Sequence, residues 1–185
     1  FAAGRFDEEA FWLLGSDGLA TWQEIDSRQP QQTSQAFSDA GMYILRDSWA
    51  ADANVAFFRC GPFGLGGAGR CAHAHCDLLS LVMWINGEPL LVDSGTYTYH
   101  GPWRNYFRLT AAHNTVMVDG QEQSEPKTFF GWKRIPEAQV AHWSGQSVTG
   151  TMTYTDQVVF TRKLTLNQRS NWDLTDGFAA ADNNQ

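Results

Sequence analysis

Basic charge and long apolar runs are both scarce in this sequence. Its 185 residues include 13 Lys and Arg against 20 Asp and Glu, which gives a formal net charge of −7 at pH 7. The sequence has no basic stripe of the kind that binds nucleic acid, so a nucleic-acid-binding protein is not expected. No apolar run reaches the roughly 18 residues of a membrane-spanning helix, and no signal peptide is recognisable.

Cysteine is also scarce. The three cysteines, Cys60, Cys71 and Cys76, are an odd number, which does not fit the disulfide framework of a small secreted domain. One disulfide together with one free thiol remains open. The cysteines therefore do not decide the cellular compartment.

Hydrophobic and aromatic residues, by contrast, are plentiful. Hydrophobic residues make up 43% of the chain and aromatic residues 14%, with eight Trp. This composition can bury a core and is not that of a disordered chain. Aromatic rings fill the core of a β-sandwich, and they also pack against the C–H face of a sugar. Core packing is the simpler interpretation for most of them.

From residue 42 onward, the pattern is typical of β-strands, because short apolar runs alternate with turn residues. The runs lie at residues 43–45, 55–58, 80–85, 88–93, 115–118, 139–143, 148–154 and 158–166. Many short strands and little helix predict a mainly β protein, an antiparallel multi-sheet β-sandwich. The glycine-rich stretch 61–69 lacks a phosphate-binding motif and predicts a loop.

The N-terminal part has a different pattern. Residues 8–14 predict a short helix that ends at Gly15. Residues 26–38 are polar, rich in Gln and interrupted by Pro30, which predicts a linker. We therefore expect two parts, residues 1–36 and residues 37–185. Because the chain begins with Phe rather than Met, we expect it to be a segment of a longer protein.

The clearest local signal is a β-hairpin around Asn86-Gly87, because both central positions of a type I′ turn need positive φ angles. Counting outward from this turn places Ser80 opposite Asp93, so Asp93 returns to the end where two His residues lie. On a continuous strand, His75 would point to the face opposite Ser80. A bend at residues 77–79 is therefore expected.

His75, Asp93 and the later His113 form a set of two imidazoles and one carboxylate, which is common at zinc and non-haem iron sites. The pair His73-x-His75 alone is a weak metal signal, since an isolated His is usually an ordinary surface or core residue. The two cysteines that flank this pair are simpler to interpret as buried, inert thiols. A cupin is disfavoured, because cupins place a Glu a few residues after the second His and none is present there.

Several motifs, in the same order, resemble the heparinase II/III-like family. They are the segment His73-Ala-His75-x-Asp77-Leu-Leu-Ser80 and residues 90–97 (LLVDSGTY), 104–108 (RNYFR), 112–116 (AHNTV) and 118–120 (VDG). The resemblance runs from about residue 37 to about residue 178. Residues 11–15 (FWLLG) resemble the last helix of the α/α toroid that precedes the β-domain in this family.

The resemblance implies a polysaccharide lyase that cleaves uronic-acid-containing glycans by β-elimination. The first His of the His-x-His motif faces the catalytic cleft in this family, which implies a catalytic role for His73. The second His, the Asp after the hairpin and the later His bind a structural metal, usually zinc, which implies His75, Asp93 and His113 as Zn²⁺ ligands. The toroid commonly supplies a Tyr together with an Asn or His.

The sequence departs from the family pattern at two positions. Ala72 stands where Gly is common and Cys76 where a small Ala is usual, but neither departure removes a ligand. The resemblance also does not assign the residues that contact the substrate, so we infer these from their position near the motifs. Arg104 and Tyr106 belong to the motif at residues 104–108, and Tyr99 lies just before it; we expect all three to contact the substrate.

Together these features predict the metal-containing β-domain of a bacterial polysaccharide lyase, periplasmic or secreted, with a short helical remnant of the toroid at its N-terminus. Its expected partners are an anionic polysaccharide and the toroid domain of the same chain, without which it would be inactive. Two other functions remain open. One is a non-catalytic, metal-stabilised β-sandwich that binds a glycan or a protein partner. The other is an iron oxygenase that uses two His and one carboxylate.

Overall fold

The computed structural model describes residues 6–26, 28, 30–64, 71–154, 158–167 and 171–180. The chain divides into two units, Phe1–Gln32 and Thr33–Gln185, which we describe separately. The second unit includes β1 (Gln35–Phe37), which lies in the segment that the sequence indicated as a linker. Residues 65–69 of the predicted glycine-rich loop lie outside the described residues.

The first unit contains the helix α1 (Glu8–Glu24). Asp7 caps its N-terminus, since an Asp7 carboxylate oxygen accepts a hydrogen bond from the Ala10 N–H at 2.9 Å. Gly15 interrupts the helix with φ 65° and ψ −165°, a backbone conformation that glycine adopts without steric cost. The predicted helix break at Gly15 is therefore confirmed, but the helical stretch that follows it was not predicted.

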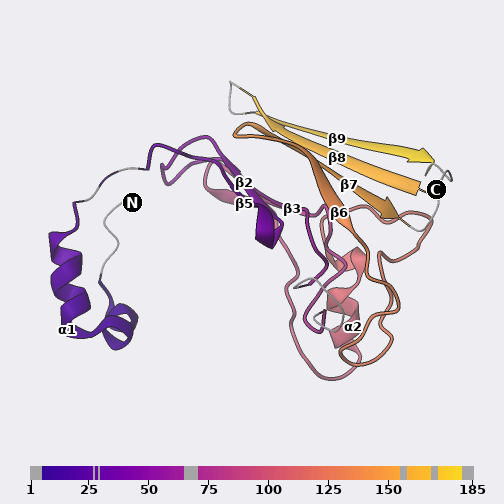
Figure 1. Ribbon diagram of the computed structural model, residues 1–185, viewed down its shortest axis with the longest axis horizontal. Coiled ribbons are helices and arrows are strands. Elements are labelled where there is room, and N and C mark those ends of the chain that lie inside the picture. The colour runs from indigo at the N-terminus through magenta and orange to yellow at the C-terminus, as the bar shows by residue number, and fades with distance from the viewer. Residues whose placement is uncertain are drawn as a thin grey trace. The chain divides into compact units, whose positions relative to one another are not determined.

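The second unit consists of two antiparallel sheets, which confirms the predicted mainly β fold. The five strands of the first sheet follow sequence order: β1, β2 (Met42–Arg46), β3 (Val55–Arg59), β4 (Leu81–Ile85) and β5 (Glu88–Leu91). The second sheet has four strands, also in sequence order: β6 (Ala138–Ser144), β7 (Ser147–Tyr154), β8 (Val158–Leu166) and β9 (Trp172–Ala180). Figure 1 shows β6 to β9 side by side, in orange to yellow.

One hydrophobic core joins the two sheets. It contains Phe58 and Leu81 from the first sheet and Phe160 from the second, each at most 1% exposed. At Gly150 in β7, the second sheet lies very close to the segment before β4. A Cβ atom at this position would be 2.5 Å from a methyl carbon of Leu79, so only glycine fits without a shift of the neighbouring side chain.

The segment between the sheets, residues 92–137, carries α2 (Trp103–Arg108) and the short 3-10 helix η2 (Thr110–Ala112). The strand predicted at residues 115–118 is wrong, because Val118 forms only an isolated bridge with Gln121. Figure 1 shows α2 and this segment gathered beyond one end of the sheets. Among the described residues, no helix is long and apolar enough to cross a membrane.

Candidate active site and metal centre

A turn at residues 77–80 redirects the chain just before β4. Leu79 has φ 58°, in the left-handed region, and the Ser80 N–H donates a hydrogen bond to the Asp77 carbonyl oxygen at 3.0 Å. The bend predicted for this position is therefore confirmed. Because the chain turns here, the alternation of side chains along β4 does not decide the direction in which the His75 side chain points.

The hairpin has the predicted turn but not the full predicted register. Asn86-Gly87 has φ angles of 51° and 77°, as a type I′ turn requires. A bulge at Leu90 in β5 then pairs Met83 of β4 with Leu91, one residue further along β5 than in a regular ladder. The predicted register, with Ser80 opposite Asp93, is therefore wrong, because a bulge shifts every later partner by one residue.

The side chain of Asn114 holds two segments of the site together where this pairing ends. Its amide nitrogen donates to the carbonyl oxygen of Leu81 in β4 and to that of Val92 just after β5, both at 2.9 Å. The sequence neighbours of Asn114 and Val92 are His113 and Asp93. The amide bridge thus brings these two side chains together, although 20 positions separate them in the sequence.

Arg162 in β8 connects the second sheet to the same region. Its Nη1 atom donates to the carbonyl oxygens of Leu79 and Asn114, at 2.8 Å each. Its Nε and Nη2 atoms donate to the two carboxylate oxygens of Asp176 in β9, also at 2.8 Å. Because Arg162 is only 5% exposed, this side chain fixes the turn before β4 and the segment of Asn114 relative to each other from inside the core.

The three predicted metal ligands lie next to one another. Nδ1 of His113 is 2.6 Å from Oδ2 of Asp93, and the ring centroids of His75 and His113 are 5.2 Å apart. The His113 side chain is 1% exposed. Its other ring nitrogen, Nε2, is buried and has no hydrogen-bond partner among the described residues. A buried polar atom without a partner is uncommon, and it marks a position where a ligand or ion would be accepted.

The surroundings favour the protonation states that bind a metal. Burial lowers the pKa of His75 from 6.5 to about 4, and the neighbouring His113 adds to this effect. The hydrogen bond from His113 lowers the pKa of Asp93, although burial opposes the change. A neutral imidazole and an ionised carboxylate are the forms that coordinate a metal ion.

The donor chemistry therefore fits a divalent ion such as zinc, which accepts imidazole nitrogen and carboxylate oxygen. The orphaned Nε2 atom of His113 supports this fit. In the described part of the chain, however, no three His, Cys, Asp or Glu side chains are grouped as they would be around an ion. Asp93 instead lies hydrogen-bonded to His113 Nδ1. Metal binding by these residues stays a prediction.

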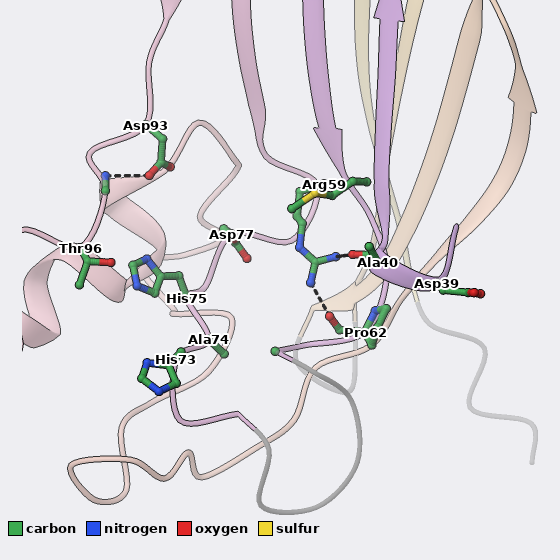
Figure 2. Close-up of a pocket in the computed structure, with 13 residues that line it drawn as sticks. Asp39, Ala40, Arg59, Pro62, His73, Ala74, His75, Asp77, Asp93 and Thr96 are labelled. Carbon is green, nitrogen blue, oxygen red and sulfur yellow. Dashed lines mark hydrogen bonds between the residues drawn. The ribbon is translucent and has the colours of Figure 1, made fainter. Parts of the chain in front are cut away.

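His73 and His75 lie on one wall of a groove of about 560 Å³. Figure 2 shows this wall, with Asp77 further along the same segment and Arg59 beyond it. Arg59 is held in place because it donates to three backbone carbonyl oxygens. Burial raises the pKa of Asp77, and the positive charge of Arg59 partly opposes this. The groove thus offers imidazole, carboxylate and guanidinium groups, which can bind an acidic sugar and move protons.

The residues expected to contact the substrate lie in different environments. The Tyr99 hydroxyl is 3.4 Å from Nδ1 of His73. Arg104 is 6% exposed and donates to a backbone carbonyl oxygen at 3.0 Å, so its guanidinium lies beneath the surface. Tyr106 is 56% exposed and packs against aromatic neighbours in α2, and it does not line the groove. Substrate contact by each of them stays a prediction.

The three cysteines are free and buried. The thiols of Cys71 and Cys76 donate to backbone carbonyl oxygens at 3.3 Å each. Burial raises the pKa of Cys60 and of Cys76 to about 12, so both remain protonated thiols at neutral pH. All three cysteines are core residues, and the structure contains no disulfide between them.

Among the groove residues that were not predicted as site residues, Asp77 and Arg59 are the two whose charged groups lie beside the histidines (Figure 2). Asp77 follows His75 by two positions in the motif, and this spacing was a usable signal for it. Arg59 reaches the groove because it ends β3, which pairs with β4. No local sequence pattern indicates that pairing.

Comparison with known proteins identifies the family. The model of the family described as "Heparinase II/III-like, C-terminal" matches residues 29–185. The chain belongs to this family. The resemblance found in the sequence motifs is thereby confirmed, and it extends over most of the chain.

Two curated relatives are heparin-sulfate lyases. The one from Bacteroides stercoris is 32% identical over 118 residues, which cover 60% of this chain and 16% of that protein. The one from Pedobacter heparinus is 27% identical over 134 residues, which cover 70% of this chain and 18% of that protein. The chain therefore spans less than a fifth of the length of either relative.

Solved structures share the fold. The heparan sulfate lyase HepC from Pedobacter heparinus superposes with a TM-score of 0.69 at 23% identity, covering 92% of this chain and 25% of that one. A crystal structure of heparinase III gives a TM-score of 0.65 at 19% identity, covering 83% of this chain and 23% of that one. The two-sheet architecture is thus the one found in part of each of these larger proteins.

Proposed function

We propose that this chain is the metal-containing β-domain of a polysaccharide lyase that cleaves uronic-acid-containing glycans by β-elimination. The observation that carries the proposal is the exposed His73 in a groove that also contains His75 and Asp93, in a chain of the heparinase II/III-like family. Two relatives are heparin-sulfate lyases, so a glycosaminoglycan of the heparan sulfate type is the first substrate class to test.

The chemistry of β-elimination explains why a histidine suits this position. The C5 proton of a uronate is weakly acidic, and neutralising the adjacent carboxylate stabilises the negative charge that develops when the proton leaves. A base removes the proton, and an acid protonates the departing O4 atom. His73 acts as the base or as the group that neutralises the carboxylate. Tyr99 contacts its Nδ1 atom, which leaves Nε2 for the substrate.

The second half of the acid–base pair belongs, in this proposal, to a toroid domain outside this chain. A Tyr with an Asn or His is the expected contribution of that domain. The 185-residue chain should therefore show negligible lyase activity alone. A periplasmic or secreted location is part of the same proposal, because polymeric glycan substrates lie outside the cytoplasm.

We further propose that His75, Asp93 and His113 hold one zinc ion with a structural role. Bound there, the ion would supply a link between three segments that are distant in sequence. Ligand binding to the folded state stabilises that state by mass action. The residues themselves already support this role, because His113 and Asp93 are in contact and His75 is adjacent.

The experiment compares the full-length gene product with the 185-residue chain on several polyuronates, with the absorbance of the unsaturated uronate product as readout. We expect turnover only with the full-length protein. His73→Ala should reduce this turnover about 10²–10⁴-fold, the usual contribution of a general acid or base, with an unchanged melting temperature. His142→Ala, which changes an exposed His in β6, is the matched control.

Two results would overturn the proposal. Robust turnover by the short chain alone would refute the need for a second domain. Full-length protein that binds a uronate polymer saturably but never cleaves it would favour the non-catalytic glycan-binding function instead.

A further inference from the structure

Two buried arginines on α2 lack a negatively charged partner. Arg104 and Arg108 are 6% and 2% exposed, and both donate to the carbonyl oxygen of Phe129 at 3.0 Å. Nε of Arg104 and both Nε and Nη2 of Arg108 have no hydrogen-bond partner, and neither side chain forms an ion pair with any described residue. Buried charges are normally paired, so this part of the protein holds uncompensated positive charge.

Three aromatic rings surround the guanidinium of Arg104. Its Cζ atom is 4.2 Å from the ring centroid of Phe129, 5.1 Å from that of Tyr99 and 5.6 Å from that of Phe130. We call Tyr99, Phe129 and Phe130 the aromatic platform. These residues are 45%, 47% and 54% exposed, respectively. A cation held against aromatic rings is a favourable arrangement, and here it leaves much of the ring surface open to solvent.

The backbone holds the platform in place. The Lys127 N–H donates to the Gly131 carbonyl oxygen at 2.9 Å, which closes the turn that presents both phenylalanines. The two arginines bind the carbonyl oxygen of Phe129 from below. The Phe129 and Phe130 rings pack edge to face, 4.6 Å apart. A ligand that stacks on this surface therefore meets rings that are already ordered, which lowers the entropic cost of binding.

The platform adjoins the candidate catalytic residue. The His73 ring centroid is 5.8 Å from that of Tyr99 and 6.4 Å from that of Phe130, and His73 itself lines the groove. A sugar bound on the platform would thus be next to the sugar that faces His73.

We propose that the aromatic platform is a subsite for one acidic pyranose residue of the substrate, adjacent to the residue that reacts at His73. The apolar C–H face of the sugar ring stacks on Phe130, and the unpaired charges of Arg104 and Arg108 favour a sugar that carries a carboxylate or a sulfate. This inference rests on the proposed lyase function and adds the residues that bind the neighbouring sugar.

The test measures KM and kcat of the full-length protein, with Phe130→Ala as the main variant. Stacking binds the substrate equally in the ground state and the transition state, so KM should rise about tenfold, equivalent to about 1.4 kcal/mol, while kcat changes less than about twofold. Phe130→Trp keeps an aromatic face and should retain a KM near that of the wild type. Phe178→Ala is the matched control, because Phe178 is 55% exposed on β9 and does not touch His73.

Sulfated and unsulfated polymers distinguish the two sources of negative charge. For Arg104→Gln, which removes one charge beneath the platform, an equal increase in KM for both polymers identifies the carboxylate as the recognised group, and a larger increase for the sulfated polymer identifies the sulfate. Either result supports the subsite.

Three outcomes would overturn it. An unchanged KM for Phe130→Ala, with normal turnover by the wild type, removes the subsite and leaves the lyase proposal intact. An unchanged KM with a lower melting temperature means that the rings instead pack against another part of the full-length protein. No cleavage of any polyuronate by the wild type removes the lyase function, and the subsite falls with it.

Discussion

Arg162 offers the sharpest test of how the site is assembled. Its guanidinium lies inside the core at 5% exposure, where it binds the carboxylate of Asp176 through two hydrogen bonds and the carbonyl oxygens of Leu79 and Asn114 through two more, all at 2.8 Å. Arg162→Met keeps most of the apolar side-chain volume and removes all four hydrogen bonds. The variant therefore isolates the polar link between the second sheet and the site.

The expected loss in free energy of unfolding follows from the groups that lose their hydrogen-bond donor in Arg162→Met. Removing one partner of a buried ion pair costs about 3–5 kcal/mol. The Asp176 side chain is 29% exposed, so water reaches its carboxylate and the lower end of that range applies to the pair. The carbonyl oxygens of Leu79 and Asn114 also lose a donor, at about 1 kcal/mol for a typical hydrogen bond. We expect the free energy of unfolding to fall by roughly 5 kcal/mol in total, about 3 kcal/mol for the ion pair and about 1 kcal/mol for each of the two carbonyl oxygens.

Urea unfolding of the 185-residue chain, followed by intrinsic Trp fluorescence, measures this change. Lys163→Met alters the adjacent, exposed residue of β8 and should change stability by less than about 0.5 kcal/mol. Zinc titration provides a second readout, because Arg162→Met should weaken zinc binding as the segments of Leu79 and Asn114 separate. A loss below about 1 kcal/mol, within the range of an ordinary single hydrogen bond, would show that Arg162 does not hold the site together.

The other predictions concern the metal, pH and core packing. His75→Ala or Asp93→Ala should lower the metal content and the melting temperature together, and chelation should reproduce both effects; protein purified without chelator that contains no metal by elemental analysis would contradict the site. In the chelated protein, stability should decline as the pH falls from 6.5 to about 4, because the unfolded chain takes up a proton at His75 that the folded chain does not; a His75→Asn variant that loses stability just as steeply in urea unfolding would disprove that assignment. Gly150→Ala should destabilise the fold by about 1–3 kcal/mol through overpacking, whereas Gly177→Ala, where an added Cβ meets nothing within 4 Å, should be nearly neutral in the same thermal melts.

Most of the strands were predictable because their determinants are local. An alternating apolar pattern places one face of a strand in the core wherever it occurs, as in β7 and β8, and short apolar runs rich in β-branched and aromatic residues mark β2 and β3. The type I′ turn at Asn86-Gly87 was predictable for the same reason, since two adjacent residues set its φ angles. The bend before β4 was predictable because, on a continuous strand, side-chain alternation would point His75 to the face opposite Ser80.

The predictions of secondary structure failed where contacts with residues distant in the sequence decide the conformation. Residues 115–118 have the composition of a strand, but the Thr115 hydroxyl and the Gln123 side chain bind the carbonyl oxygen of Leu78, so this segment is held by side chains rather than by a ladder. β9 was missed because its burial pattern is mostly exposed, which leaves little apolar alternation to detect. α2 was missed because it buries two arginines, the reverse of the usual helical pattern.

The sequence by itself determined the family, the mainly β architecture and the residue types of the candidate site. Motif order and residue identity carry that information, and both are properties of the chain alone. Only the tertiary structure decided which of these residues meet. The contact of His113 with Asp93 depends on the amide bridge of Asn114 and on the bulge in β5, and the burial of Arg104 beneath aromatic rings depends on the fold of a distant turn. Such contacts arise from long-range packing, in which residues far apart in sequence compete for the same space, and no local pattern encodes the result.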